Sequence, residues 1–299
     1  MALPLVVGVD GSEASLRAVD WAAREAAVRG YALRLVHASL WEKYEDDAPA
    51  VPLGPRPGRH DLAHQILRTA VARAAASRPE VRVSTEAVAE DPETALLRAA
   101  RNAVALVTGR TGRGPVQELL LGSVSLAVAA HAQCPVIVVR GSTAGVTGTH
   151  QRILLGVGDH ESADSATRFA FAEAAARHCV LDAVRTWRAP AGRTADHPLL
   201  SGDPARQCEQ AAEDVLADAL RGPARVHPDV PVRPVTVEGP ARRILIDRSA
   251  AADLVIVGAR RRHGHFGLQL GRVAHAVLHH ADCPVVVVAQ HGSRTTPEE

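Results

Sequence analysis

Short runs of apolar residues alternate with amphipathic segments along the whole chain. In the first half, five apolar runs predict strands, at residues 3–10, 32–38, 81–88, 103–108 and 136–140. Four periodic segments predict helices, one starting after Ser12 or Ser15 and ending at Gly30, and others at residues 61–76, 92–101 and 123–131. A polar, proline-rich loop is expected at residues 41–57.

The second half repeats this alternation. Strands are predicted at residues 153–157, 181–187, 232–237, 254–257 and 285–288, and helices at residues 162–177, 205–220, 240–249 and 272–279. Continuously apolar strands separated by helices are typical of a parallel sheet covered on both faces. Because crossovers are right-handed, we predict two doubly wound α/β domains, residues 1–140 and 151–290. The composition of residues 141–149 predicts a flexible linker.

The two halves are copies of one another at an offset of about 149 residues. Matching positions are Gly109 and Gly258, Gly122 and Gly271, His131 and His280, and Cys134-Pro135 and Cys283-Pro284. A repeat of this length indicates a duplicated domain rather than a solenoid.

Composition excludes several classes of protein. The chain has 299 residues, 46% hydrophobic and 22% charged, which describes a folded globular protein, and its net charge of +1 gives no electrostatic footprint for nucleic acid. It has no apolar stretch long enough to span a membrane, and its first residues pass into a strand without a signal-peptide pattern, so we expect a cytoplasmic location. Lys43 is the one lysine, which excludes P-loop and Schiff-base chemistry. The four cysteines are expected to pack in the core in a reducing compartment.

The candidate chemistry lies after the fourth strand, in the spacing Gly109-x2-Gly112-x9-Gly122-Ser123. Glycines at a strand end let backbone N–H groups approach an anion, and Gly122-Ser123-Val124-Ser125 opens a helix whose N-terminus favours phosphate. The alternative is that these are ordinary loop glycines and that Ser123 is only a helix cap. On doubly wound sheets, ligands bind where the strand order reverses, which favours the phosphate interpretation.

At these residues the chain resembles the universal stress protein family, in its tandem-domain form. The resemblance rests on Val6-Val7-Gly8-Val9-Asp10-Gly11-Ser12, Leu35-Val36-His37-Ala38, the glycine-serine signature and Cys134-Pro135-Val136-Ile137-Val138-Val139. It implies strand order 3-2-1-4-5 in each domain and ATP, with or without Mg²⁺, bound in the first. The two halves would pack as a pseudo-dimer through their last strands, and two chains could pair in the same way.

The resemblance also implies roles for particular residues. Asp10 would contact the adenosine end, Ala38 and Val88 would line the adenine pocket, and the signature residues would hold ribose and phosphates. The full set is Val9, Asp10, Gly11, Ala38, Val88, Gly109, Arg110, Gly112, Arg113, Gly114, Gly122, Ser123, Val124 and Ser125. From the residues alone, Asp10 could equally stabilise the turn before Gly11, and His37 is interpreted as a strand-end residue rather than a catalyst.

The second half departs from the pattern at each critical position. Gly158 stands where the first half has Asp10, Arg261 replaces Gly112, and Arg272 replaces Ser123. Arginine could still bind an anion, but we expect the nucleotide geometry to be lost there. His275 and His279, four residues apart, are interpreted as structural, and no metal site is predicted.

The sequence therefore predicts a stress-response protein that binds ATP as a regulatory ligand and carries no catalytic residues. Two alternatives remain open. One is an adenylyl-transferring or ATP-hydrolysing enzyme on the same architecture, and the other is an interaction module that binds no nucleotide. A protein partner is expected but cannot be named.

Overall fold

The computed structural model describes residues 3–40, 59–110, 121–158, 160–189, 204–260 and 270–290. It divides into two compact units, Met1–Arg140 and Gly141–Glu299. The loop expected at residues 41–57 lies outside the described residues. Among the helices that are described, none is both long and apolar enough to cross a membrane.

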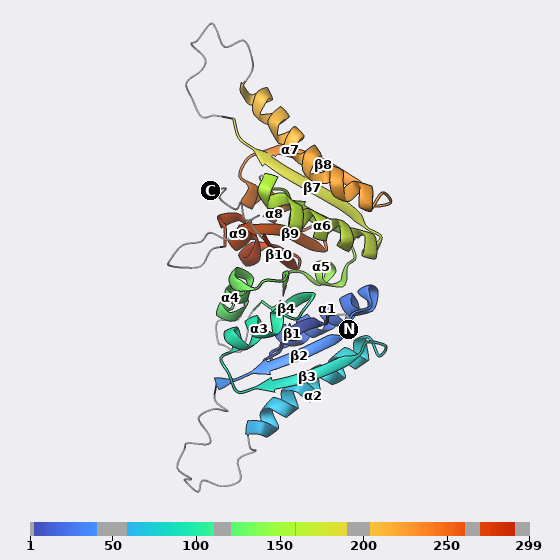
Figure 1. Cartoon of the computed structure of the whole chain (residues 1–299), viewed down its shortest axis with the longest axis vertical. Coiled ribbons are helices and arrows are strands. Elements are labelled where there is room, and N and C mark those ends of the chain that lie inside the picture. Colours follow the sequence, from blue (N-terminus) through green and yellow to red (C-terminus); the bar gives the residue numbers. More distant parts are fainter. Residues whose placement is uncertain are drawn as a thin grey trace, which may run out of the picture. The chain divides into compact units, whose positions relative to one another are not determined.

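The first unit alternates strands and helices throughout (Figure 1). Its elements are β1 (Leu5–Gly8), α1 (Glu13–Arg29), β2 (Leu33–Ala38), α2 (Arg59–Ser77), β3 (Val83–Val88), α3 (Pro92–Ala100), β4 (Ala105–Gly109), α4 (Ser123–His131) and β5 (Val136–Val139). All pairings are parallel, in the order β3-β2-β1-β4-β5. The predicted strand order 3-2-1-4-5 is therefore confirmed in this unit.

The second unit has the same order, β8-β7-β6-β9-β10, again all parallel. Its elements are α5 (Thr143–Thr147), β6 (Arg152–Gly156), α6 (His160–Arg177), β7 (Val180–Trp187), α7 (Pro204–Val226), β8 (Val232–Glu238), α8 (Ala241–Ser249), β9 (Leu254–Arg260), α9 (Arg272–His280) and β10 (Val285–Gln290). The prediction of two doubly wound parallel sheets is confirmed.

Helices cover both faces of the first sheet because its central strands are apolar on both sides. Leu35 and Leu106, on β2 and β4, are completely buried. A Cβ placed on Gly8 would meet the Leu96 side chain of α3, whereas one placed on Gly109 would meet the backbone of Ala14 in α1. Helix α1 also packs against α2, and α3 against α4. One face therefore carries α1 and α2, and the other carries α3 and α4.

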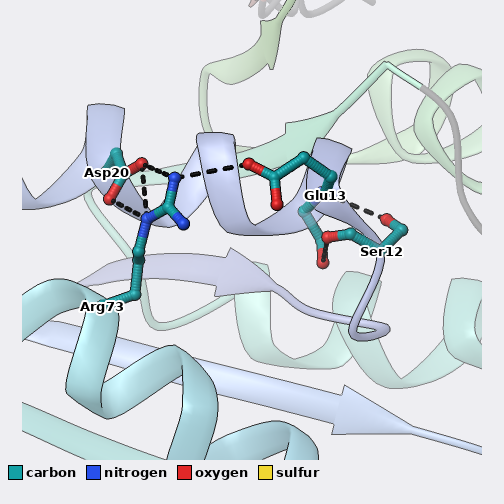
Figure 2. Close-up of polar contacts among 5 residues, drawn as sticks. Ser12, Glu13, Asp20 and Arg73 are labelled. Carbon is teal, nitrogen blue, oxygen red and sulfur yellow. Dashed lines mark hydrogen bonds and ion pairs between the residues drawn. The ribbon is translucent and has the colours of Figure 1, made fainter.

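Helix α1 begins and ends at the predicted residues. Ser12 Oγ accepts a hydrogen bond from Ser15 N (3.2 Å), and Gly30 ends the helix in the left-handed region at φ 69°. Arg73 of α2 donates from Nε to both carboxylate oxygens of Asp20 (2.9 Å each) and reaches Glu13 Oε1 at 3.3 Å (Figure 2). This bidentate ion pair fixes α2 against α1.

The segment predicted as a flexible linker is instead a folded part of the second unit. Ser142 Oγ caps helix α5 at Gly145 N (3.2 Å), and Ser142 N donates to Asp282 O (2.9 Å). Gly141 has φ 90°, and a Cβ there would lie 2.2 Å from the backbone of Asp282. Glycine is needed here because two backbones touch, so its presence did not indicate flexibility.

Helix α7 is longer than predicted. The helix was expected to end at Leu220, but it continues through Pro223 to Val226, and His227 N still bonds to Pro223 O (3.0 Å). Proline can lie in a final helical turn because its φ is helical, although it donates no backbone hydrogen bond there.

Candidate functional site

The site predicted from the sequence lies at the carboxyl edge of the first sheet, between β1 and β4. These strands are neighbours at the centre of the order β3-β2-β1-β4-β5. The chain leaves β1 for α1 on one face and leaves β4 for α4 on the other, and such a reversal is where doubly wound sheets bind ligands. Gly112, Arg113 and Gly114 lie outside the described residues, and the other predicted site residues are described.

Strand alternation shows which predicted residues share a face. Gly8 points toward α3, and the register pairs Gly8 with Val36 and Ala38 with Val88. Because side chains alternate, Ala38, Val88 and Thr108 lie on the same face as Gly8, the one covered by α3 and α4. The structure therefore brings the two predicted adenine-pocket residues together at the end of β2 and β3.

His37 points to the opposite face. Its side chain is buried, and Nδ1 donates to Val9 O at 2.8 Å. The carbonyl can only accept, so the imidazole hydrogen is on Nδ1. This bond holds the end of β1, and it agrees with the interpretation of His37 as a strand-end residue.

Asp10 stabilises the turn between β1 and α1. Its Oδ1 accepts from Ser12 N (2.9 Å) and from Ser12 Oγ (2.6 Å), and Gly11 is in the left-handed region at φ 80°. The turn role considered from the sequence is thus present in the structure. Contact between Asp10 and a nucleotide stays a prediction.

Gly109 is needed by the fold as well as by the predicted site. A Cβ at this position would lie 2.6 Å from the carbonyl oxygen of Ala14, in the first turn of α1. The signature therefore begins with a glycine whose lack of a side chain is explained by helix packing alone.

Helix α4 opens without a side-chain cap. Gly122 is its N-cap residue, at φ −62° and ψ 144°, and its own N–H donates to Arg110 O (2.8 Å). Ser123 is exposed, whereas Ser125 is buried and its hydroxyl donates to Gly109 O (2.8 Å). Within the described residues no side chain caps the first turn of α4, and an uncapped helix N-terminus is the arrangement that binds phosphate or carboxylate.

Thr108 is a residue that the sequence prediction missed. It is only 4% exposed, and within the described part of the chain its hydroxyl has no hydrogen-bond partner. It lies one residue before Gly109, on the face of α3 and α4. Buried hydroxyls without a partner are rare, so Thr108 is a further candidate site residue beside Gly109.

The second unit has the same backbone arrangement with different chemistry. At the offset of 149 residues, Val257 stands for Thr108, Ala274 for Ser125 and Arg272 for Ser123. Near the first strand of each unit the offset is 148, which aligns Gly8-Val9 with Gly156-Val157 and places Gly158 opposite Asp10. Helix α9 also opens without a side-chain cap, at Gly271. Arg185 takes the place of His37 and donates from Nη1 to Val157 O (3.3 Å), so the strand-end bond is retained. Arg261 lies outside the described residues.

This comparison of the halves was available in the sequence. Thr108 has a hydroxyl where Val257 has a methyl, and Ser125 has a hydroxyl where Ala274 has a hydrogen, so both positions lose a polar group in the second half. Such a pair of substitutions at adjacent points in the fold is the signal that could have identified Thr108.

Three of the four cysteines are packed in the core. All four are free thiols, and Cys134, Cys179 and Cys283 are buried. Burial raises the pKa of Cys134 to about 11 and that of Cys179 to about 11, which keeps both thiols protonated near neutral pH. In the part of the chain that the structure describes, no group of three or more His, Cys, Asp or Glu side chains is arranged around a common metal position.

The fold and the site define a protein with two doubly wound α/β units in tandem. Both units have an uncapped helix after the fourth strand, and in the first unit this helix is accompanied by hydroxyl side chains. Comparison with known proteins agrees with this description. The sequence matches the family model described as the Universal stress protein family at residues 1–140 and again at 149–289. A universal stress protein of Mycobacterium tuberculosis is 36% identical over 296 residues, covering 96% of this chain and 97% of that protein.

Two solved structures are also similar. A universal stress protein from Archaeoglobus fulgidus has a TM-score of 0.65 at 17% identity and covers 96% of this chain and 98% of its own. A universal stress protein from the same organism in complex with dAMP is 26% identical over 46% of this chain and 96% of its own, with a TM-score of 0.32. The chain belongs to the universal stress protein family and carries two of its domains in tandem.

Proposed function

We propose that this chain binds one adenine nucleotide, at the carboxyl edge of its first unit, as a regulatory ligand in a stress response. ATP, with or without Mg²⁺, is the nucleotide that the glycine-serine signature predicts. The observation that carries the proposal is the difference between the two units. The first has Thr108, Ser123 and Ser125 around an uncapped helix, and the second has Val257, Arg272 and Ala274 at the same positions.

Each part of the nucleotide would meet a suitable group. The phosphates would accept hydrogen bonds from the first-turn N–H groups of α4 and from the exposed Ser123 hydroxyl. Ala38 and Val88 are half-buried and apolar, as the edge of an adenine pocket requires. The loop of Val9, Asp10 and Gly11 lies at the end of the neighbouring strand, where ribose would lie in a ligand that spans both loops.

The nucleotide would act as a bound ligand rather than a substrate. The hydroxyl of Ser125 already donates to Gly109 O, and Asp10 Oδ1 already accepts in the turn at Ser12, so both stabilise the local fold.

We also propose domain boundaries at 1–140 and 151–290 and a cytoplasmic location. We further propose a protein partner that binds differently to the nucleotide-bound and the nucleotide-free chain. Pairing of chains through their last strands stays a prediction.

Equilibrium dialysis with radiolabelled nucleotides tests the proposed ligand class. We expect ATP to be retained by the full chain and displaced by unlabelled ADP or AMP, with GTP at least about tenfold weaker, because a pocket that matches one base leaves polar groups unpaired with the other. Equal displacement by ATP and GTP would contradict adenine recognition. Absence of retained ATP would favour the nucleotide-free interaction module, and steady release of ADP or pyrophosphate would favour the enzyme.

A further inference from the structure

Exposed arginines gather at the carboxyl edge of the second sheet, in the unit that the proposed nucleotide site does not use. Arg188 follows β7, Arg242 and Arg243 lie in the first turn of α8, and Arg272 is the first residue of α9. All four residues are exposed. Within the described part of the chain, Arg243 Nε lies 3.7 Å from Asp247 Oδ2, and the other three arginines form no ion pair.

The topology of the second unit brings these arginines to one edge. Its strands are all parallel and each helix returns the chain to the start of the next strand, so α8 and α9 both begin at the carboxyl edge. The two helices also pack against each other. Gly239 N donates to Trp187 O (2.9 Å), so the residue before Arg188 contacts the loop that leads into α8. The four arginines therefore lie on neighbouring segments of the surface.

The first unit has different charges at the equivalent positions. At the offset of 149 residues the matching pairs are Glu93 and Arg242, Thr94 and Arg243, and Ser123 and Arg272. Asp91 caps α3 by accepting a hydrogen bond from Thr94 N (3.1 Å), whereas Pro240 at the same position of α8 provides no side-chain cap. The first unit thus supplies carboxylates at the start of α3, and the second unit has arginines at the start of α8.

Arginine is unfavourable in the first turn of a helix, because the N-terminus is the positive end of the helix dipole. Neither α8 nor α9 has an acidic residue in its first turn to offset this charge. In residues 238–250 the acidic residues are Glu238, which precedes α8, and Asp247, one turn further along it than Arg243. A carboxylate from outside the chain would therefore stabilise the starts of both helices.

We propose that this arginine edge (Arg188, Arg242, Arg243 and Arg272) is the docking surface for an acidic segment of a partner protein. The Asp and Glu side chains of that segment would lie at α8 where Asp91 and Glu93 lie at α3, and guanidinium groups bind carboxylates through paired hydrogen bonds. This inference gives the chemistry of the protein partner in the proposed function and rests on that part of it.

The surface fits an acidic protein better than a single-stranded nucleic acid. Proteins that bind single strands stack the bases on aromatic side chains as well as neutralising the phosphates. No Trp, Tyr or Phe is exposed among the residues that the structure describes. Arginine, in contrast, is one of the residue types that contribute most to protein–protein binding.

The first unit supplies variants that should fold. A triple variant with Arg242→Glu, Arg243→Thr and Arg272→Ser carries the residues of the equivalent helices. Its melting temperature should be a few degrees higher than that of the parent, because the unfavourable charges are removed from the helix starts. Arg225→Glu is the matched control for Arg242→Glu, since Arg225 is exposed in the last turn of α7, at the opposite edge of the sheet.

Fluorescence anisotropy with a labelled peptide of alternating Asp and Glu residues, without nucleotide and at about 0.15 M ionic strength, tests the proposal. We expect the parent chain to bind this peptide and not the matching peptide of Asn and Gln. Binding should be at least about tenfold weaker in Arg242→Glu and undetectable in the triple variant, because a like charge faces the peptide or the arginines are gone. Arg225→Glu should bind like the parent.

Several results would overturn the proposal. These are no binding of the acidic peptide by the parent, a triple variant that binds as tightly as the parent, or equal weakening by Arg225→Glu and Arg242→Glu. Displacement of the peptide by less sodium tripolyphosphate than unlabelled peptide would assign the edge to a phosphate ligand instead. A parent that binds ATP but not the peptide refutes this surface alone, and one that binds the peptide but not ATP refutes the nucleotide site alone.

Discussion

The Ser125 hydroxyl donates a 2.8 Å hydrogen bond to the carbonyl oxygen of Gly109, and this bond joins the first turn of α4 to the end of β4. Both groups are buried, so the bond sets where the uncapped N-terminus of α4 lies relative to the end of β4. Ser125 is thus a positioning residue, whereas the exposed Ser123 is free to meet a ligand.

Replacing each serine by alanine should separate these two roles. Ser125→Ala leaves a buried carbonyl without its donor and should lower the free energy of unfolding by about 1 kcal/mol. Ser123→Ala should change that free energy by less than about 0.5 kcal/mol but weaken ATP binding severalfold. Denaturant unfolding and ATP titration of both variants would measure this. Equal stability losses would contradict the assignment.

Thr108→Val should have opposite effects on folding and on binding. In the free protein it removes a buried hydroxyl without a partner, so the stability should stay the same or rise by about 1 kcal/mol. ATP binding should weaken if that hydroxyl serves the ligand.

Val257→Thr in the second unit is the matched control. It introduces a buried hydroxyl into an apolar position and should destabilise that unit by about 1–3 kcal/mol. If Thr108→Val instead destabilises the first unit by a similar amount and leaves ATP affinity unchanged, the hydroxyl serves the fold and not the site.

Gly109→Ala should destabilise the first unit whether or not nucleotide is present. The added methyl would lie 2.6 Å from Ala14 O, and we expect a cost of about 2 kcal/mol. Gly222→Ala in α7 is a suitable control because nothing lies within 4 Å of the added Cβ, so it should be neutral or slightly stabilising. A Gly109→Ala variant as stable as the parent would show that α1 can move away.

Alkylation of the native chain should distinguish the cysteines. With pKa values of about 11, Cys134 and Cys179 are less than about 1% thiolate at pH 8, and both are buried, whereas Cys208 is only half-buried and so is more accessible to a reagent. We expect iodoacetamide to modify Cys208 first, as mapped by mass spectrometry. Modification of Cys134 or Cys179 at the same rate would mean that the core opens on that timescale.

Much of the fold could be predicted because it depends on periodicity. Strands β1 and β4 were predicted from short apolar runs, and the start of α1 was predicted from a cap at Ser12. These are local patterns that fit one kind of structure. Helix α4 begins at Ser123 and ends at His131, as predicted.

Three of the errors and omissions share one physical origin, which is that the role of a small residue depends on what faces it. Gly141 looked like linker sequence, but its missing side chain admits the backbone of Asp282. Gly109 looked like a phosphate-loop residue, but it also admits α1. Thr108 looked like an ordinary strand residue until its hydroxyl proved to be buried without a partner.

The stoichiometry of ATP binding tests the central claim most directly. Calorimetric titration of the full chain should give one site, and Gly122→Glu should abolish it, because a carboxylate at the N-terminus of α4 would repel the phosphates. Gly271→Glu, the matched change at the N-terminus of α9, should leave it intact, since a Cβ there meets nothing within 4 Å. Two equivalent sites, no binding at high micromolar ATP, or loss of binding in Gly271→Glu but not in Gly122→Glu would contradict the account.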